Sequence, residues 1–172
     1  NLPAQYHHKL HLCYHGIRIV SGGFEYGDKY ICESKGNNTI VAVGRMVQKK
    51  GFSKLLKAFA LVVRKKPNCR LKIVGNGPGQ KQLIEMIEQL ALKDYVELLG
   101  WQISDVTLQV IRQATVLVAP SLIADDGDRD GIPNVILEAF ASGTPVIASK
   151  LEGISEVVEH RKTGLLVKTG DI

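Results

Sequence analysis

Short apolar runs alternate with longer amphipathic stretches from residue 39 to residue 167 of this 172-residue chain. Each apolar run has four or five residues, and most of these runs are apolar throughout. Such continuity is expected of strands that are buried on both faces of a parallel sheet. The predicted strands are residues 39–43, 70–74, 95–99, 115–119, 145–148 and 164–167.

Apolar residues at helical spacing fill the intervals between these strands. The residues expected to face the core are Leu55, Leu56, Phe59, Leu61, Val62 and Val63, then Leu83, Ile84, Ile87, Leu90 and Leu92, then Val106 and Ile111, then Val135, Ile136, Ala139 and Phe140. Alternation of strands and helices predicts right-handed crossovers and a doubly wound α/β fold. One domain with a sizeable core is expected at this length.

Ligands on such sheets bind beyond the carboxyl ends of the strands. The loops that begin there are residues 44–51, 75–79, 100–104, 120–133 and 149–153. Four of these five contain a glycine next to a helix start, where backbone N–H groups point outward. All the motifs discussed below fall on these loops.

Residues 1–38 have a different pattern. Leu10, Leu12 and Tyr14 alternate with polar neighbours, which predicts a strand, and residues 21–38 are expected to form a surface connection. The chain begins with asparagine and stops soon after a glycine turn, as expected of a piece of a longer protein.

Composition narrows the classes of partner and compartment. Apolar residues make up 45% and charged residues 23%, as in soluble globular proteins, and the net charge of +5 favours anionic ligands. No basic run is interleaved with aromatics, which argues against nucleic acid. Cys13, Cys32 and Cys69 lack metal or redox spacing and predict inert thiols in a reducing, cytoplasmic compartment. No apolar run is long enough to span a membrane, and no signal peptide is visible.

Two glycine-containing loops are candidates for phosphate and nucleotide contacts. Gly44 and Arg45 follow the first strand, and Lys50 begins the next helical stretch, so both cations could reach one diphosphate. Two solvated surface cations explain the same residues equally well. The run from Gly75 through Gly77 to Gly79 matches neither a dinucleotide fingerprint nor a P-loop. A tight turn accounts for it, and a backbone close to a nucleotide is the functional alternative.

The acidic loop resembles the first half of a calcium-binding loop. Its sequence D-G-D-R-D-G at residues 126–131 places oxygen ligands correctly, but the twelfth position is Leu137, and Glu138 comes one residue late. Pro133 and Asn134 also predict a helix start inside the loop. Calcium binding is therefore disfavoured, as is a metal site at His7, His8 and His11, whose default location is the surface.

Asp130 and Glu138 are a more specific candidate for ligand binding than the calcium-like loop. Pro133 in the first turn of a helix would place Glu138 more than one turn inside it, bordering a packed face. Two carboxylates and exposed amides could accept hydrogen bonds from sugar hydroxyls and donate them to phosphate. The alternative is that the aspartates only keep the loop hydrated and that Glu138 is an ordinary solvated helix residue. A further helix is expected to begin at Gly153, with Ser155 and Glu156 in its first turn.

Six motifs occur in order: G-R-x4-K-G, V-G-x-G-P, L-G-W, P-S, D-G-x-P-N-V-x-x-E-A-x-A-x-G-x-P-V-I-A and G-I-x-E-x-V. Together they resemble the C-terminal, donor-binding domain of GT-B retaining glycosyltransferases of family 4, or group 1, from residue 10 to about residue 168. The acidic insertion further resembles bacterial exopolysaccharide enzymes of the colanic-acid type. The resemblance implies a Rossmann-like sheet, the C-terminal half of a GT-B fold.

The resemblance also implies roles for individual residues. Arg45 and Lys50 match the cations that bind the donor diphosphate, Glu138 matches the acid that holds the ribose, and Asp130 matches the acid that contacts the transferred sugar. The family usually has glutamate at the position that matches Asp130, and the aspartate side chain is one methylene shorter. Arg45, Lys50 and Asp130 would be catalytic, and the other donor-binding positions would be Gly44, Gly75, Gly77, Leu99, Gly131, Ile132, Pro133, Asn134 and Val135.

The implied domain organisation is a connection at residues 1–38 from an absent N-terminal acceptor domain, followed by a C-terminally truncated nucleotide-sugar-binding domain at residues 39–172. The full-length enzyme would transfer a hexose to a glycan or lipid-linked acceptor without metal or cofactor. It would act in the cytoplasm, with peripheral association at the inner face of the membrane. The fragment alone would not catalyse. The alternatives are a sugar-nucleotide epimerase and a non-enzymatic nucleotide- or calcium-binding module.

Overall fold

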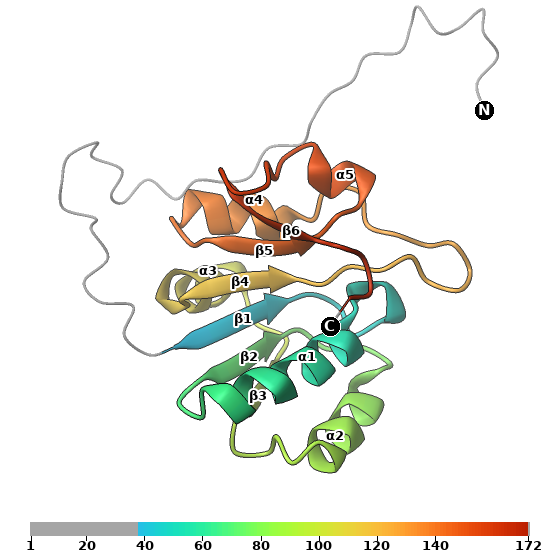
Figure 1. Cartoon of the computed structure of the whole chain (residues 1–172), viewed down its shortest axis with the longest axis vertical. Coiled ribbons are helices and arrows are strands. Elements are labelled where there is room, and N and C mark those ends of the chain that lie inside the picture. Colours follow the sequence, from blue (N-terminus) through green and yellow to red (C-terminus); the bar gives the residue numbers. More distant parts are fainter. Residues whose placement is uncertain (1–37, 172) are drawn as a thin grey trace, which may run out of the picture.

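The computed structural model of the protein describes residues 38–171, which fold around one parallel sheet (Figure 1). Its strands are β1 (Thr39–Val43), β2 (Arg70–Val74), β3 (Val96–Gly100), β4 (Val116–Ala119), β5 (Val146–Ser149) and β6 (Gly164–Val167). The helices are η2 (Gln48–Lys50), α1 (Phe52–Lys65), α2 (Gln80–Gln89), α3 (Ser104–Gln113), α4 (Asn134–Ala141) and α5 (Glu152–Ser155). The alternating α/β architecture predicted from the sequence is confirmed.

The strands lie in the order β3-β2-β1-β4-β5-β6, and all neighbouring strands are parallel. The chain builds outward from β1 through β2 to β3, then returns to place β4 on the other side of β1. The strand order therefore reverses between β1 and β4. In open α/β sheets, that reversal point leaves a crevice at the carboxyl ends of the two strands, where ligands bind.

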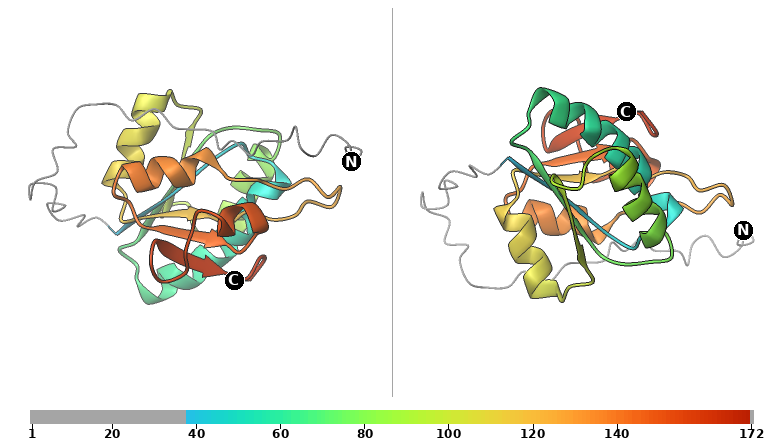
Figure 2. Two further views of the ribbon diagram at one scale, coloured as in Figure 1. Left: turned by 90° about the horizontal axis from the view of Figure 1, so that it is seen from above. Right: turned by 90° about the horizontal axis from the view of Figure 1, so that it is seen from below.

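Helices cover both faces of the sheet (Figure 2). On one side, α1 and α2 pack against Ala42, Leu71 and Ile73 in a core that includes Phe59. On the other side, the core under α3, α4 and α5 includes Val41, Leu117, Ala148, Ile136 and Ile154. Successive strand residues therefore point into different cores, as the two-residue period of a strand requires.

Three strands are displaced by one residue from the sequence prediction at one or both ends. The strand predicted at 145–148 is β5 at Val146–Ser149, because Pro145 has no N–H, although its carbonyl still accepts from Leu117 N at 2.9 Å. The strand predicted at 95–99 is β3 at Val96–Gly100, since the N–H of Tyr95 donates to Leu92 O. The strand predicted from residue 115 begins at Val116 in β4.

Several predictions about the helices are wrong in detail. Leu61 and Ile84 do not face the core and are 47% and 43% exposed, because the neighbouring apolar residues already fill each buried face. Pro133 is the residue before α4 and does not lie in its first turn. α5 begins at Glu152, which puts Glu156 at its end.

The segment before residue 38 lies outside the described residues. The predictions made for it concern the strand at residues 10–14, the surface connection, the three histidines, Cys13 and Cys32. Cys69, within the described part, is a free and buried thiol, as expected. No helix within residues 38–171 is long and apolar enough to cross a membrane.

Candidate functional site

The loops that leave β1 and β2 pack backbone against backbone. Met46 N donates to Asn76 O at 2.8 Å, and Gly79 N donates to Met46 O at 2.9 Å. A Cβ on Gly75 would lie 2.0 Å from Gly44 O, and one on Gly77 would lie 2.7 Å from Met46 N and O. Glycine is required at these positions because any side chain would collide with the neighbouring loop. The packing of the two loops therefore accounts for the glycine run after β2 without a ligand.

The loops after β1 and β4 also meet at close range. Gly51 adopts a left-handed conformation with φ +65° between η2 and α1, and a Cβ there would lie 1.9 Å from Pro120 O. Leu122 N donates to Lys49 O at 2.7 Å. These contacts hold the lysine-bearing turn against the start of the acidic loop, on both sides of the point where the strand order reverses.

Lys50 and Asp130 form a partly buried ion pair across this junction. Lys50 Nζ lies 2.9 Å from both Oδ1 and Oδ2 of Asp130, and the side chains of the two residues are 19% and 8% exposed. The hydroxyl of Ser121, a residue that is only 2% exposed, donates to Asp130 Oδ2 at 2.7 Å. Two residues predicted as site residues from separate loops are thus in contact, 80 positions apart in the sequence.

A second and more exposed ion pair lies beside the first. Lys49 Nζ is 2.9 Å from Asp128 Oδ2, and Asp128 is 54% exposed. The pKa of the Lys49 ammonium is raised, chiefly by its hydrogen bond to Asp128. Asp126 accepts a hydrogen bond from the Asp128 backbone N–H at 2.9 Å. Two of the acids of the calcium-like sequence therefore bind lysines, and within residues 38–171 no group of acids, histidines and cysteines has metal-binding geometry.

Arg45 and Glu138 lie outside this network. Arg45 is exposed and makes no ion pair within residues 38–171, so its guanidinium is available to an anion. Glu138 lies in α4 and is partly buried, and desolvation raises the pKa of its carboxyl. Glu138 has no cation partner within the same range. Within residues 38–171, the guanidinium of Arg45 and the carboxylate of Glu138 therefore have no ion-pair partner.

The remaining predicted donor-binding residues lie on three elements. Leu99, partly buried, lies in β3 and packs on the core under α3 and α4. Gly131 is packed against α5, because a Cβ on Gly153 would lie 2.7 Å from Gly131 C and O. The residues from Ile132 to Val135 form the approach to α4 and its first turn; Pro133 is buried, Asn134 is exposed, and Val135 packs on the core.

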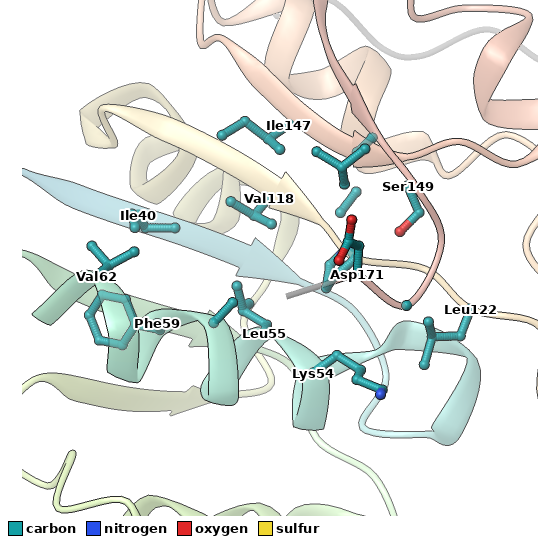
Figure 3. Close-up of a pocket in the computed structure, with 16 residues that line it drawn as sticks. Ile40, Lys54, Leu55, Phe59, Val62, Val118, Leu122, Ile147, Ser149 and Asp171 are labelled. Atoms are coloured by element: carbon teal, nitrogen blue, oxygen red, sulfur yellow. The ribbon is translucent and has the colours of Figure 1, made fainter.

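Two hollows among residues 38–171 differ in character. A polar one of about 510 Å³ lies between the acidic loop and the start of α5, and Asp130, Arg129, Lys150 and Glu152 are among the residues that line it. An apolar one of about 300 Å³ lies between α1 and the sheet, where Figure 3 shows Ile40, Val118 and Ile147 on neighbouring strands. Of these two hollows, the polar one includes two predicted site residues, Asp130 and Gly131, and the apolar one includes none, so the chemistry of the candidate site is polar.

Sequence reasoning missed three members of the polar network. Lys49, Asp128 and Ser121 were not predicted as site residues, although each lies on one of the loops at the carboxyl edge of the sheet. Ser121 carried a usable signal, because it lies two residues after the end of β4, at the strand end where ligand-binding residues gather. The contact of Lys49 with Asp128 links residues 79 positions apart and has no local signature.

Comparison with known proteins supplies the family. The model for glycosyl transferases group 1 matches residues 31–172. The chain is 36% identical over 132 residues to WcaL of Escherichia coli K12, assigned as a colanic acid biosynthesis glycosyltransferase, and 34% identical to the amylovoran biosynthesis glycosyltransferase AmsK of Erwinia amylovora. Each alignment covers 77% of this chain and 32% of the relative, so the chain spans about a third of the length of these curated relatives.

Solved structures agree with the sequence relatives. Anabaena HepE, solved with UDP-glucose, is 28% identical, with a TM-score of 0.68 over 79% of this chain and 36% of its own. Sucrose-phosphate synthase from Thermosynechococcus elongatus is 31% identical, with a TM-score of 0.66 over 80% of this chain and 34% of its own. The parallel sheet, the motif order and the family match lead to one conclusion: the chain belongs to the glycosyl transferases group 1 family and has the Rossmann-like fold of its GT-B members.

Proposed function

We propose that this chain is the donor-binding domain of a retaining glycosyltransferase and binds a nucleoside-diphosphate sugar at the carboxyl edge between β1 and β4. The observation that carries the proposal is the junction of the two loops that flank this point. There, Lys50 Nζ lies 2.9 Å from Asp130, and Arg45, on the same loop as Lys50, is exposed and without an ion pair in the described part of the chain.

The two cations suit a diphosphate in complementary ways. The guanidinium of Arg45 is a planar fork that can bind two phosphate oxygens, whereas the ammonium of Lys50 is a compact charge on a flexible stem. When the bond between the sugar and the diphosphate breaks, negative charge grows on the leaving phosphate. Cations fixed in advance at that place stabilise the charge without a metal ion.

Carboxylates at the same edge suit the hydroxyl-rich parts of the donor. Glu138 has no cation partner within residues 38–171 and is partly desolvated, so a ribose hydroxyl that donates to it would replace lost water. Anabaena HepE, similar in fold and sequence, has been solved with UDP and with UDP-glucose. This supports a nucleotide sugar as the ligand class here.

The proposal extends to the whole protein. The whole protein transfers a hexose-type sugar to a glycan or lipid-linked acceptor, and the new bond keeps the anomeric configuration of the donor. The acceptor is bound mainly by residues outside this chain. The names of the relatives, which include amylovoran and lipopolysaccharide core glycosyltransferases, support this class of acceptor. The net charge of +5 is compatible with peripheral contact with an anionic membrane at its cytoplasmic face.

Calorimetric titration with UDP, GDP and ADP in buffer containing EDTA tests the proposal. We expect one of the three to bind with a 1:1 stoichiometry and without a metal. The proposal would be contradicted if the folded protein bound none of the three at millimolar concentration. It would also be contradicted if binding required a divalent metal. A calcium titration of the same sample is the matched control, and we expect no heat of binding from it.

A further inference from the structure

The ammonium of Lys50 is held by another side chain of this chain. Both carboxylate oxygens of Asp130 lie 2.9 Å from Lys50 Nζ. An ammonium has three N–H donors, so two hydrogen bonds to Asp130 leave one donor for a phosphate oxygen. The carboxylate therefore determines the direction in which the remaining donor points.

Asp130 is itself held in place from the other side. The hydroxyl of Ser121 donates to Oδ2 at 2.7 Å, and Ser121 is 2% exposed, so water has little access to replace this bond. The backbone on both sides of Ser121 is also fixed. Pro120 O abuts Gly51, and Leu122 N donates to Lys49 O. The serine hydroxyl is thus tied to the same turn that carries Lys50.

We propose that Ser121 and Asp130 are positioning residues for Lys50, and that both act on the donor diphosphate through the lysine. The proposal rests on the proposed function, because it takes the diphosphate as the partner of Lys50. It adds to the role implied by family resemblance, in which the residue at position 130 contacts the transferred sugar. Oδ2 of Asp130 accepts from both Lys50 and Ser121, and Oδ1 accepts from Lys50, so side chains of this chain hold the carboxylate in one orientation.

The physical gain is the preorganisation of a flexible cation. A lysine side chain has large rotamer freedom, which it loses when it binds a ligand. If the Lys50 ammonium is held by Asp130 before binding, that loss is incurred during folding and does not weaken the affinity for the diphosphate. Removal of the Ser121 hydroxyl takes away one hydrogen bond to Oδ2, so the whole carboxylate group of Asp130 can rotate more freely. The Lys50 side chain, which is itself unchanged, is then held less firmly.

The test uses a ligand that has no sugar. The nucleoside diphosphate that the chain binds among UDP, GDP and ADP is titrated against wild type, Ser121→Ala and Asp130→Asn. We expect binding to weaken about fivefold in Ser121→Ala and about tenfold in Asp130→Asn. If Asp130 acted only on the sugar, both variants would bind the sugar-free diphosphate as wild type does. Binding within twofold of wild type, or tighter, in both variants would overturn the proposal.

A double-mutant cycle separates positioning from general loosening of the loop. In a Lys50→Met background, Ser121→Ala is expected to change the residual affinity less than twofold, because the lysine through which the serine acts is absent. An undiminished fivefold loss in that background would overturn the proposal, since the serine would then act by another route. Asp130→Asn, nearly isosteric with wild type, decides the matter if Ser121→Ala does not fold.

The neighbouring pair supplies a matched control. Asp128→Asn breaks the contact with Lys49 on the same two loops but leaves the contacts of Ser121, Asp130 and Lys50 intact. Because Asp128 is 54% exposed, we expect a change in diphosphate affinity of less than twofold. An equal loss in this control and in Ser121→Ala would overturn the proposal. Absence of diphosphate binding by wild type would refute the proposed function itself, a different result from unequal variants.

Discussion

The candidate site has two halves that are built in different ways. Between β1 and β2, the loops touch through backbone atoms, and Gly75 leaves no room for even one methyl group. Between β1 and β4, the loops touch through side chains of opposite charge, chiefly Lys50 and Asp130. The first half fixes the course of the chain, and the second half places charge.

The two halves should respond differently to substitution. A Cβ added at Gly75 would lie 2.0 Å from the carbonyl oxygen of Gly44, so any side chain there would displace the loop and unfold the region. A side-chain pair can lose one partner and leave the backbone in place, so substitution there changes ligand affinity first. Stability should therefore report on the glycine half and binding on the charged half.

The largest expected effect is on stability in the glycine half. Gly75→Ala places a Cβ 2.0 Å from Gly44 O at a φ of +126°, and we expect a loss of about 4 kcal/mol or more in the free energy of unfolding. Gly127→Ala is the control, because its φ is +82° but no atom lies within 4 Å of the added Cβ. The strain of a positive φ alone should cost about 1–2 kcal/mol.

Urea unfolding followed by circular dichroism gives both free energies. Equal losses at the two positions would show that the close approach of the two loops does not matter for stability. The contrast between the halves would then fail, because the glycine half would be no more restrictive than an open turn.

A smaller effect, with opposite signs for stability and binding, is expected at Glu138. Burial raises the pKa of this carboxyl in the folded state, so the folded protein binds more protons than the unfolded chain between the two pKa values. Stability therefore falls as pH rises through that window, and the ionised carboxylate is destabilising at neutral pH. Glu138→Gln should raise the free energy of unfolding by less than about 1 kcal/mol at pH 7.

The same substitution should weaken nucleoside diphosphate binding several-fold if the carboxylate accepts from the ribose. Below about pH 4, where the carboxyl is protonated in both states, the stability gain should vanish. Thermal melts of both proteins at pH 4 and pH 7, with titrations at pH 7, measure the two effects. A variant less stable than wild type at pH 7 would show that the desolvation of Glu138 is compensated in the folded protein.

The fold could be predicted from the sequence because its signals are local. Short and mostly apolar runs marked all six strands of residues 38–171, and three of these strands, β1, β2 and β6, have the predicted bounds. At the other strands, the predicted bounds are wrong by one residue where a terminal residue makes only one backbone hydrogen bond to the sheet. Pro145, for example, takes part only through its carbonyl. The strand order was not predicted, because it depends on contacts between distant segments.

The candidate site was predictable only as a set of separate residues. Lys50 and Asp130 were singled out, one from a basic loop and one from an acidic loop, but no local pattern shows that they bind each other. Ser121 was missed, since a serine after a strand is common and its partner lies nine positions away across a loop. The family resemblance supplied roles, whereas the contacts of Asp130 with Lys50 and Ser121 appear only in the folded structure.

The central claim is that Lys50 meets the diphosphate of a nucleotide sugar. The most direct measurement is the affinity gained from the second phosphate, taken as the ratio of dissociation constants of the nucleoside monophosphate and diphosphate. We expect this ratio to fall about tenfold or more in Lys50→Ala and to fall also in Arg45→Ala, because charge-assisted hydrogen bonds to phosphate are lost. Lys57→Ala, on an exposed position of α1, should leave it unchanged. An unchanged ratio in Lys50→Ala would contradict the account.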